Sequence, residues 1–263
     1  MKNILLSIDF SKHAYNAAIY AAELAKHTNT RLILFHAYNP VEPEEDIDQK
    51  LLATERQVQM KLDSLALKLQ ALTGISVTRL LKPGRLVEET LYVAKRIKAD
   101  LILFGVEKVT PQIYKYLDKQ VLQLIRKSCI PIMLVPSTTV FQPYEQVLLP
   151  TDNFDLQHDP VNQKFLNKLF YRFRGVKFLS VKEISKQEDP VVKDEMMPVA
   201  AGDDFLSDDI TYNQQTYTHL HHPQLFMASN ALASEIANTF TSEELKQIET
   251  VPLLLLPDTY VLL

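Results

Sequence analysis

The sequence predicts an α/β fold that is built twice in one chain. An internal repeat indicates the duplication: ILLSIDF at 4–10 returns as VLLPTDNF at 147–154, and PIMLVP at 131–136 returns as PLLLLP at 252–257. The two copies start one ordinary domain length apart. Short apolar runs alternate with segments of helical periodicity, and this alternation predicts a parallel sheet with helices on both faces.

The first copy supplies a complete set of elements. Its first strand runs into Ser11, a typical N-cap residue, and then into a helix with alanines on one face. Because these side chains are small, the helix must pack close to the sheet. The expected strands are 3–9, 31–37, 75–81, 100–105 and 131–136, with a turn at Pro83 and Gly84. The expected helices are the one after Ser11, 48–73, 86–97 and 112–127.

The long helix at 48–73 carries an apolar stripe and is followed by Gly74, a residue suited to a helix C-terminus. The stripe is interpreted as core rather than as a leucine zipper. Its members are Leu51, Val58, Leu62, Leu65, Leu69 and Leu72.

The second copy keeps both ends of the pattern and loses part of its middle. Residues 183–209 carry nine acidic residues and two lysines with little helical periodicity, which predicts a solvated loop in place of about one helix. An amphipathic helix is expected around Phe165, Leu166, Leu169, Phe170 and Phe173. Strands are expected at the start of the copy and at 176–183, 210–220, 224–228 and 253–256, with helical stretches within 230–249. The expected domains are 1–138 (the first half) and 147–263 (the second half), joined by a linker at 139–146.

Composition narrows the class of protein. The chain is 46% hydrophobic and 23% charged, and no apolar run is long enough to span a membrane. Residues 1–140 carry 19 basic against 14 acidic residues, and 141–263 carry 9 against 18, which favours docking of the two halves. The scattered basic residues and a pI near 6.0 argue against nucleic acid as a partner. A single cysteine, Cys129, is interpreted as a small buried side chain, and we expect a cytoplasmic protein.

Three segments of the first half carry a family resemblance. IDFS at 8–11 before an alanine-rich helix, ADLILFG at 99–105 and CIPIMLVP at 129–136 resemble the universal stress protein family. The resemblance covers nearly all of 1–136 and returns, more weakly, at both ends of 145–257. It implies an open five-stranded parallel sheet in each domain. It also implies dimer-like pairing through the last strands, here 131–136 and 252–257 of one chain, so that the halves form an intramolecular pseudo-dimer.

Nucleotide-binding members of that family carry Gly-x2-Gly-x9-Gly-Ser/Thr after the fourth strand, where bare backbone approaches phosphate. Gly105 matches the first glycine, but Lys108, Asp118 and Lys119 replace the later positions. The carboxylates of Glu107 and Asp118 would repel phosphate. After Gly202 the second half contains no glycine. We therefore expect no cofactor and no ATP site of the family's kind.

The resemblance still implies a ligand crevice in the first half, at the carboxyl ends of the strands. Asp9 matches the family aspartate, Ala37 the residue beside an adenine, and Phe104 with Gly105 the end of the fourth strand. The alternative role of Asp9 is to cap the helix that follows it. The candidate ligand-binding residues are Ser7, Asp9, Ala37, Phe104, Gly105, Lys108 and Lys119.

Other chemistry has little support in the sequence. His219, His221 and His222 are interpreted as a polar strand edge rather than as metal ligands, because a third ligand at a defined spacing is missing. The acidic run at 203–209 lacks the glycine and the alternation of a calcium loop. A Gly-x-Ser-x-Gly elbow is absent, so we expect neither catalytic residues nor a metal.

These observations favour a noncatalytic stress-response protein that acts through contacts with a protein partner whose identity the sequence does not give. The alternative is a sensor of a small ligand, in which Lys108 and Lys119 hold a nucleotide or another anion near Asp9. A slow nucleotide hydrolase is a third and weaker alternative. Neither nucleic acid nor membrane is an expected partner, and assembly into a further homo-oligomer stays open.

Overall fold

The computed structural model describes residues 1–38, 47–109, 117–149, 160–180, 224–229 and 249–257. Several expected features lie outside these residues: the acidic segment at 183–209, the strand at 210–220, the three histidines and most of 230–249. Asp152, the counterpart of Asp9 in the repeat, also lies outside them.

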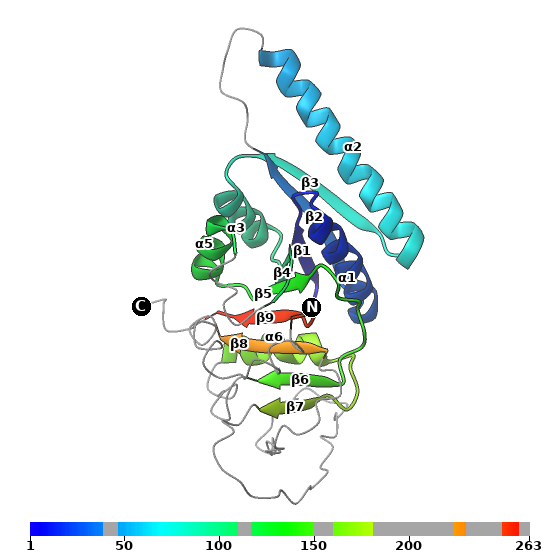
Figure 1. The fold of residues 1–263 in the computed structure, drawn as a ribbon, viewed down its shortest axis with the longest axis vertical. Coiled ribbons are helices and arrows are strands. Elements are labelled where there is room, and N and C mark those ends of the chain that lie inside the picture. The colour runs from blue at the N-terminus through cyan, green and yellow to red at the C-terminus, as the bar shows by residue number, and fades with distance from the viewer. Residues whose placement is uncertain (39–46, 110–116, 150–159, 181–223, 230–248, 258–263) are drawn as a thin grey trace, which may run out of the picture.

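The described strands form one sheet of nine, in the order β3-β2-β1-β4-β5-β9-β8-β6-β7 (Figure 1). The strands are β1 Asn3–Ser7, β2 Arg31–Tyr38, β3 Val77–Pro83, β4 Leu101–Val106, β5 Ile132–Pro136, β6 Gln146–Leu149, β7 Lys177–Ser180, β8 Leu225–Ser229 and β9 Leu253–Leu256. The helices are α1 Lys12–Thr28, α2 Ile47–Thr73, α3 Leu86–Arg96, α5 Lys119–Lys127 and α6 Pro160–Phe170.

The sheet changes direction once, between β5 and β9. These two strands pair antiparallel, with Met133 opposite Leu254, whereas all other neighbours pair parallel. The order β7-β6-β8-β9 follows the same pattern as β2-β1-β4-β5 in the first half. The strands expected at the ends of the two halves therefore meet in the middle of one sheet.

Helix α1 forms as its sequence predicts. The Ser11 hydroxyl accepts a hydrogen bond from the backbone N–H of Ala14 at 3.3 Å, and Asn29 ends the helix in the left-handed conformation. The alanine face is buried against the sheet, as expected. Its buried members include Ala14, Ala17, Ala18, Ala21 and Ala25.

Helix α2 buries a face that differs slightly from the predicted stripe. Leu62, Leu65 and Leu69 are buried, and Gly74 ends the helix with a φ of 77°. The prediction for Leu72 is wrong, because its side chain is 65% exposed. The buried face of the helix contains Leu62, Leu69 and Thr73, and Leu72 lies beside this face. The buried Thr73 hydroxyl donates to the Leu69 carbonyl at 2.7 Å.

Two apolar clusters, one on each face of the sheet, both cross from the first half into the second. One cluster contains buried residues of α1, α2 and α6, and the other contains those of α3 and α5. On the α6 side, Phe165, Leu166, Leu169 and Phe170 are buried as expected, with Phe173 just beyond the helix. Each half therefore completes the apolar core of the other.

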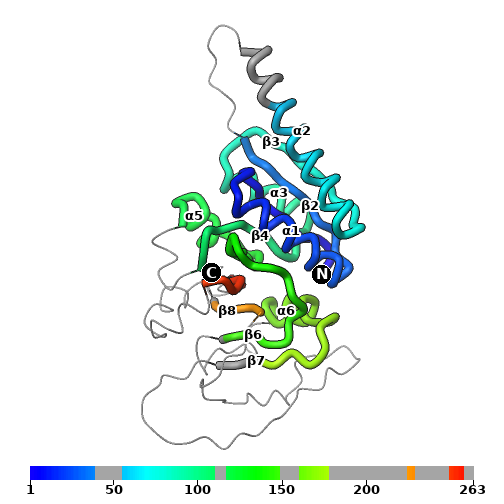
Figure 2. Tube along the Cα trace, turned by 45° about the vertical axis from the view of Figure 1, so that its right-hand side comes forward, coloured from blue at the N-terminus to red at the C-terminus, as the bar shows by residue number. Residues whose placement is uncertain are grey.

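Residues 139–146, where a linker is expected, are packed rather than loose; Figure 2 draws the trace that leads into β6. Tyr144 is buried, and its hydroxyl shares a hydrogen bond of 2.8 Å with that of Tyr20 in α1. The Asn16 amide, also in α1, donates to the carbonyls of Pro136 and Thr139 at 2.8 and 2.9 Å. The linker is thereby fixed to the first helix of the first half.

Two further details of the first half differ from expectation. Helix α5 begins at Lys119, after the N-cap Asp118, rather than at 112, and residues 110–116 lie outside the described part. Cys129 is exposed rather than buried. Ser128 takes the buried position, where its hydroxyl donates to the Ile130 carbonyl at 2.7 Å and accepts from the Ile130 N–H at 3.0 Å, which turns Cys129 outward.

Candidate functional site

The candidate site lies where the strand order of the first half reverses. Strand β1 pairs with β2 on one side and with β4 on the other. In open parallel sheets, ligands bind beyond the carboxyl ends of the strands at such a point. The segments that leave β1 and β4 here are residues 8–11 and 107–109.

Asp9 organises the turn from β1 into α1. Its Oδ1 atom accepts hydrogen bonds from the Ser11 N–H at 2.9 Å and from the Ser11 hydroxyl at 2.5 Å. Ser11, rather than Asp9, is the N-cap, so Asp9 stabilises the start of α1 indirectly, by holding Ser11. Partial burial raises the pKa of Asp9, but the bonds from Ser11 and the nearby His13 outweigh it and leave the pKa below its usual value. A carboxylate that is 66% exposed thus stands at the switch point.

Phe10 is a residue of this site that sequence reasoning missed. It has a φ of 63°, which is uncommon for a side chain of its size and costs on the order of 1 kcal/mol. Its ring lies 5.0 Å from that of His36, and the Lys61 ammonium stands 5.6 Å from the ring centre. His36 in turn donates from Nδ1 to the Ile8 carbonyl at 2.6 Å. The sequence motif contains Phe10, but nothing in it signals this backbone conformation.

The candidate residues within the strands are largely covered. Ser7 and Phe104 are each 5% exposed, and Phe104 belongs to the apolar cluster on the α3 and α5 face. Ala37 is half-buried and packs against the same cluster. These three side chains shape the sheet under the site.

Gly105 lies where β4 passes the first turn of α1. A Cβ atom at this position would meet the backbone of His13 and would lie 2.7 Å from the Ala14 nitrogen. Any side chain at Gly105 would therefore push α1 off the sheet. Asp9 and Gly105 both adjoin His13, so the structure brings these two predicted site residues to the same helix N-terminus.

The loop after β4, residues 107–109, runs toward the second half. The Val109 N–H donates to the Glu249 carbonyl at 3.1 Å, and the Lys108 ammonium lies 3.5 Å from the Glu249 carboxylate. On the other side of the loop, the Ser137 N–H and hydroxyl donate to the Glu107 carbonyl at 3.2 and 2.9 Å. The described contact of Lys108 is thus with Glu249 and not with Asp9.

Lys119 is the first residue of α5. The preceding Asp118 accepts the Gln120 N–H at 2.7 Å and serves as the N-cap. The two positions at which the resemblance expects glycine and hydroxyl therefore act here as the start of a capped helix.

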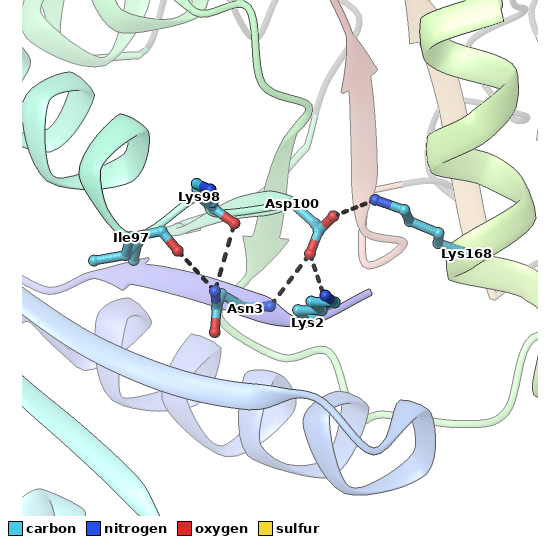
Figure 3. A network of polar contacts seen from close by, with 6 residues as sticks. All are labelled: Lys2, Asn3, Ile97, Lys98, Asp100 and Lys168. Carbon is cyan, nitrogen blue, oxygen red and sulfur yellow. Dashed lines mark hydrogen bonds and ion pairs between the residues drawn. The ribbon is translucent and has the colours of Figure 1, made fainter.

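A second polar contact joins the halves at the other end of β4, just before this strand begins (Figure 3). Asp100 accepts hydrogen bonds from the Lys2 N–H at 2.6 Å and from the Lys168 ammonium of α6 at 2.8 Å. The Asn3 N–H donates to Asp100 at 3.3 Å, and the Asn3 side-chain amide donates to the Ile97 carbonyl at 2.7 Å. Burial raises the pKa of Asp100, but the bonds from Lys168, Lys2 and Asn3 outweigh it and hold the pKa below its usual value.

Within the described ranges, no three histidine, cysteine or carboxylate side chains gather as a metal site. None of the helices placed by the structure has the length and apolar character needed to cross a membrane.

Comparisons with known proteins agree with this architecture. The family model described as "Universal stress protein family" matches residues 1–136. A Thermus aquaticus protein described as "Universal stress protein in QAH/OAS sulfhydrylase 3'region" is 34% identical over 142 residues, which are 51% of this chain and 98% of that protein.

One solved structure extends the likeness of fold to nearly the whole chain. A universal stress protein of Archaeoglobus fulgidus matches 97% of this chain and 96% of its own, with a TM-score of 0.60 and 13% identity. A universal stress protein family member from Burkholderia pseudomallei matches 51% of this chain and 96% of its own, with a TM-score of 0.43 and 22% identity. The capped alanine helix, the parallel strand order and the match over 1–136 together place this chain in the universal stress protein family.

Proposed function

We propose that this member of the family is a noncatalytic stress-response protein that acts through protein contacts and does not bind ATP in the family manner. The observation that carries the proposal is the hydrogen bond from the Val109 N–H to the Glu249 carbonyl. It commits a backbone donor of the loop after β4 to the second half. The exposed Cys129 and the absence of other cysteines suit a reducing cytoplasm.

The start of α5 supports the same proposal. A helix N-terminus attracts phosphate because its first N–H groups lack partners and its dipole is positive there. At α5 the carboxylate of Asp118 already takes the Gln120 N–H. A triphosphate would have to displace this carboxylate and approach it with like charge, so the residues present do not fit that group.

We further propose that the halves are two family domains, 1–138 and 147–263, joined by the linker at 139–146 and paired as an intramolecular pseudo-dimer. The antiparallel pairing of β5 with β9 and the matching strand orders on either side support this arrangement. The second domain is the reduced one.

The nucleotide carried by the purified protein tests the proposal. The native chain is purified without added nucleotide and denatured in acid, and the extract is separated by anion-exchange chromatography. We expect no nucleotide in stoichiometric amount. One adenine nucleotide per chain would contradict the proposal.

A small-ligand sensor is the second candidate, and the group around Asp9 favours it. The exposed Asp9 carboxylate lies beside Phe10, whose ring faces His36 and Lys61, so charged and aromatic groups meet at the switch point. In this case Lys108→Ala and Lys119→Ala should each weaken binding of a nucleotide or another anion without unfolding the chain. If the native protein binds neither kind of ligand, the sensor is excluded.

A further inference from the structure

Glu249 offers the loop after β4 two kinds of acceptor at once. Its main-chain carbonyl takes the Val109 N–H at 3.1 Å, and its carboxylate lies 3.5 Å from the Lys108 ammonium. An external anion bound by this loop would satisfy the same two groups, a backbone donor and a cation. A residue of the second half thus supplies what an anionic ligand would supply.

The contact belongs to a packed seam between the halves. Val109 is 1% exposed and shares an apolar cluster with Val106 and Val251, which follows Glu249 by two residues. The Thr139 hydroxyl donates to the Thr250 carbonyl at 2.5 Å, next to Glu249. The backbone of Glu249 is therefore held from both sides, and its contact with the loop does not depend on the exposed ion pair alone.

The contact with Glu249 decides which way Lys108 points from the loop after β4. The switch point between β1 and β4 faces the N-terminus of α1, where the helix dipole favours negative charge. Lys108 leaves β4 close to that point but is drawn toward β9 by Glu249. We propose that Glu249 is an internal latch, which occupies the amide and the cation of this loop and so keeps phosphate ligands out of the first half.

This inference rests on the proposed function, because it names the residue that prevents anion binding in a chain proposed not to bind ATP. The variant Glu249→Gln removes the carboxylate and keeps the carbonyl, so the seam is preserved. Glu23→Gln makes the same charge change on another half-buried glutamate, in α1, and is the matched control.

The experiment titrates the full-length proteins with inorganic tripolyphosphate at low ionic strength, by calorimetry. Because the strength of an exposed ion pair limits the gain, we expect Glu249→Gln to bind about two- to fivefold more tightly than the native chain and Glu23→Gln. Glu249→Lys, which adds a second cation, should bind more tightly still, on the order of tenfold. Adding Lys108→Gln to Glu249→Gln should cancel the gain.

The outcomes separate the latch from the proposed function. Equal binding by the native chain, Glu249→Gln and Glu249→Lys, whether all tight or all absent, would overturn the latch. The latch would also be overturned if Glu23→Gln tightened tripolyphosphate binding as much as Glu249→Gln does. It would be overturned too if adding Lys108→Gln left the tighter binding of Glu249→Gln unchanged. Tight binding of magnesium and ATP by the native chain would instead contradict the proposed function. Thermal unfolding of each variant verifies that the fold is retained.

Discussion

Two residues at the switch point, Gly105 and Asp9, have structural roles in the fold that need no ligand. Gly105 is where the family places its first phosphate-loop glycine, yet its lack of a side chain is required here by the backbone of His13 and Ala14. Asp9, the family aspartate, holds Ser11 in place as the cap of α1. Both positions therefore have a structural role in α1 that does not depend on a bound nucleotide.

The close packing of Gly105 against α1 predicts that a methyl group at this position strongly lowers the free energy of unfolding. Gly105→Ala should lower the free energy of unfolding by about 1–3 kcal/mol, because its Cβ would overlap the backbone of α1. Gly74→Ala is the comparison: nothing lies within 4 Å of that Cβ, and only the positive φ opposes it, at about 1 kcal/mol. Urea denaturation measures both. An unfolding free energy unchanged in Gly105→Ala would show that α1 is not held this closely.

The lowered pKa of Asp100 predicts that the stability of the protein depends on pH. Its pKa is lowered in the folded state, so the stabilisation that it gives is present above the unfolded value of about 3.9 and is lost as the pH falls through the folded pKa. Asp100→Asn should therefore cost about 1–2 kcal/mol of unfolding free energy at pH 7 and much less below pH ~3. Chemical denaturation across this range measures the difference. A cost that stays constant with pH would contradict the charged contact with Lys168.

Among the elements, strand β9 could be predicted in full from the sequence, whereas the start of α5 could not. Strand β9 spans the predicted residues because a short apolar run lies between two prolines, and such runs are buried on both faces. The predicted start of α5 at 112 is too early, because comparison with the family motif identifies Asp118 only as a replaced glycine and not as an N-cap. Nothing in the sequence motif signals the φ of Phe10, and the outward turn of Cys129 follows from the hydrogen bonds between Ser128 and Ile130, which the prediction of a buried cysteine did not consider.

The cap of α5 can be tested by itself. Asp118→Ala should lower the free energy of unfolding by about 1 kcal/mol, because the Gln120 N–H loses its acceptor. Asp118→Ser keeps a capping oxygen without the charge and should cost only a few tenths of that. Thermal unfolding compares the two variants. Equal losses would mean that the charge of Asp118, and not its capping bond, stabilises the helix.

At the scale of the whole molecule, the two halves depend on one another. Apolar clusters on both faces of the sheet contain residues from each half, and the linker is bound to α1 through Tyr144. Polar contacts flank the β5 and β9 pair at both edges, Lys108 with Glu249 and Asp100 with Lys168. The family resemblance implies which strands meet, whereas these side-chain contacts could be found only in the structure.

The pairing of β5 with β9 predicts the effect of a buried charge. Leu254 is fully buried opposite Met133, so Leu254→Asp should separate the halves, expose their apolar faces and cause aggregation. Leu67→Asp introduces the same charge at an exposed position of α2 and should leave the protein unchanged in size. Size-exclusion chromatography with light scattering measures the outcome. An unaltered species for Leu254→Asp would contradict intramolecular pairing.

We propose that the first half does not hold ATP. Calorimetric titration of the purified native chain with magnesium and ATP, after bound nucleotide has been excluded, is the decisive measurement. We expect no saturable heat at millimolar ATP. Saturable binding of one ATP per chain would contradict it and would make the small-ligand sensor the better account of this protein.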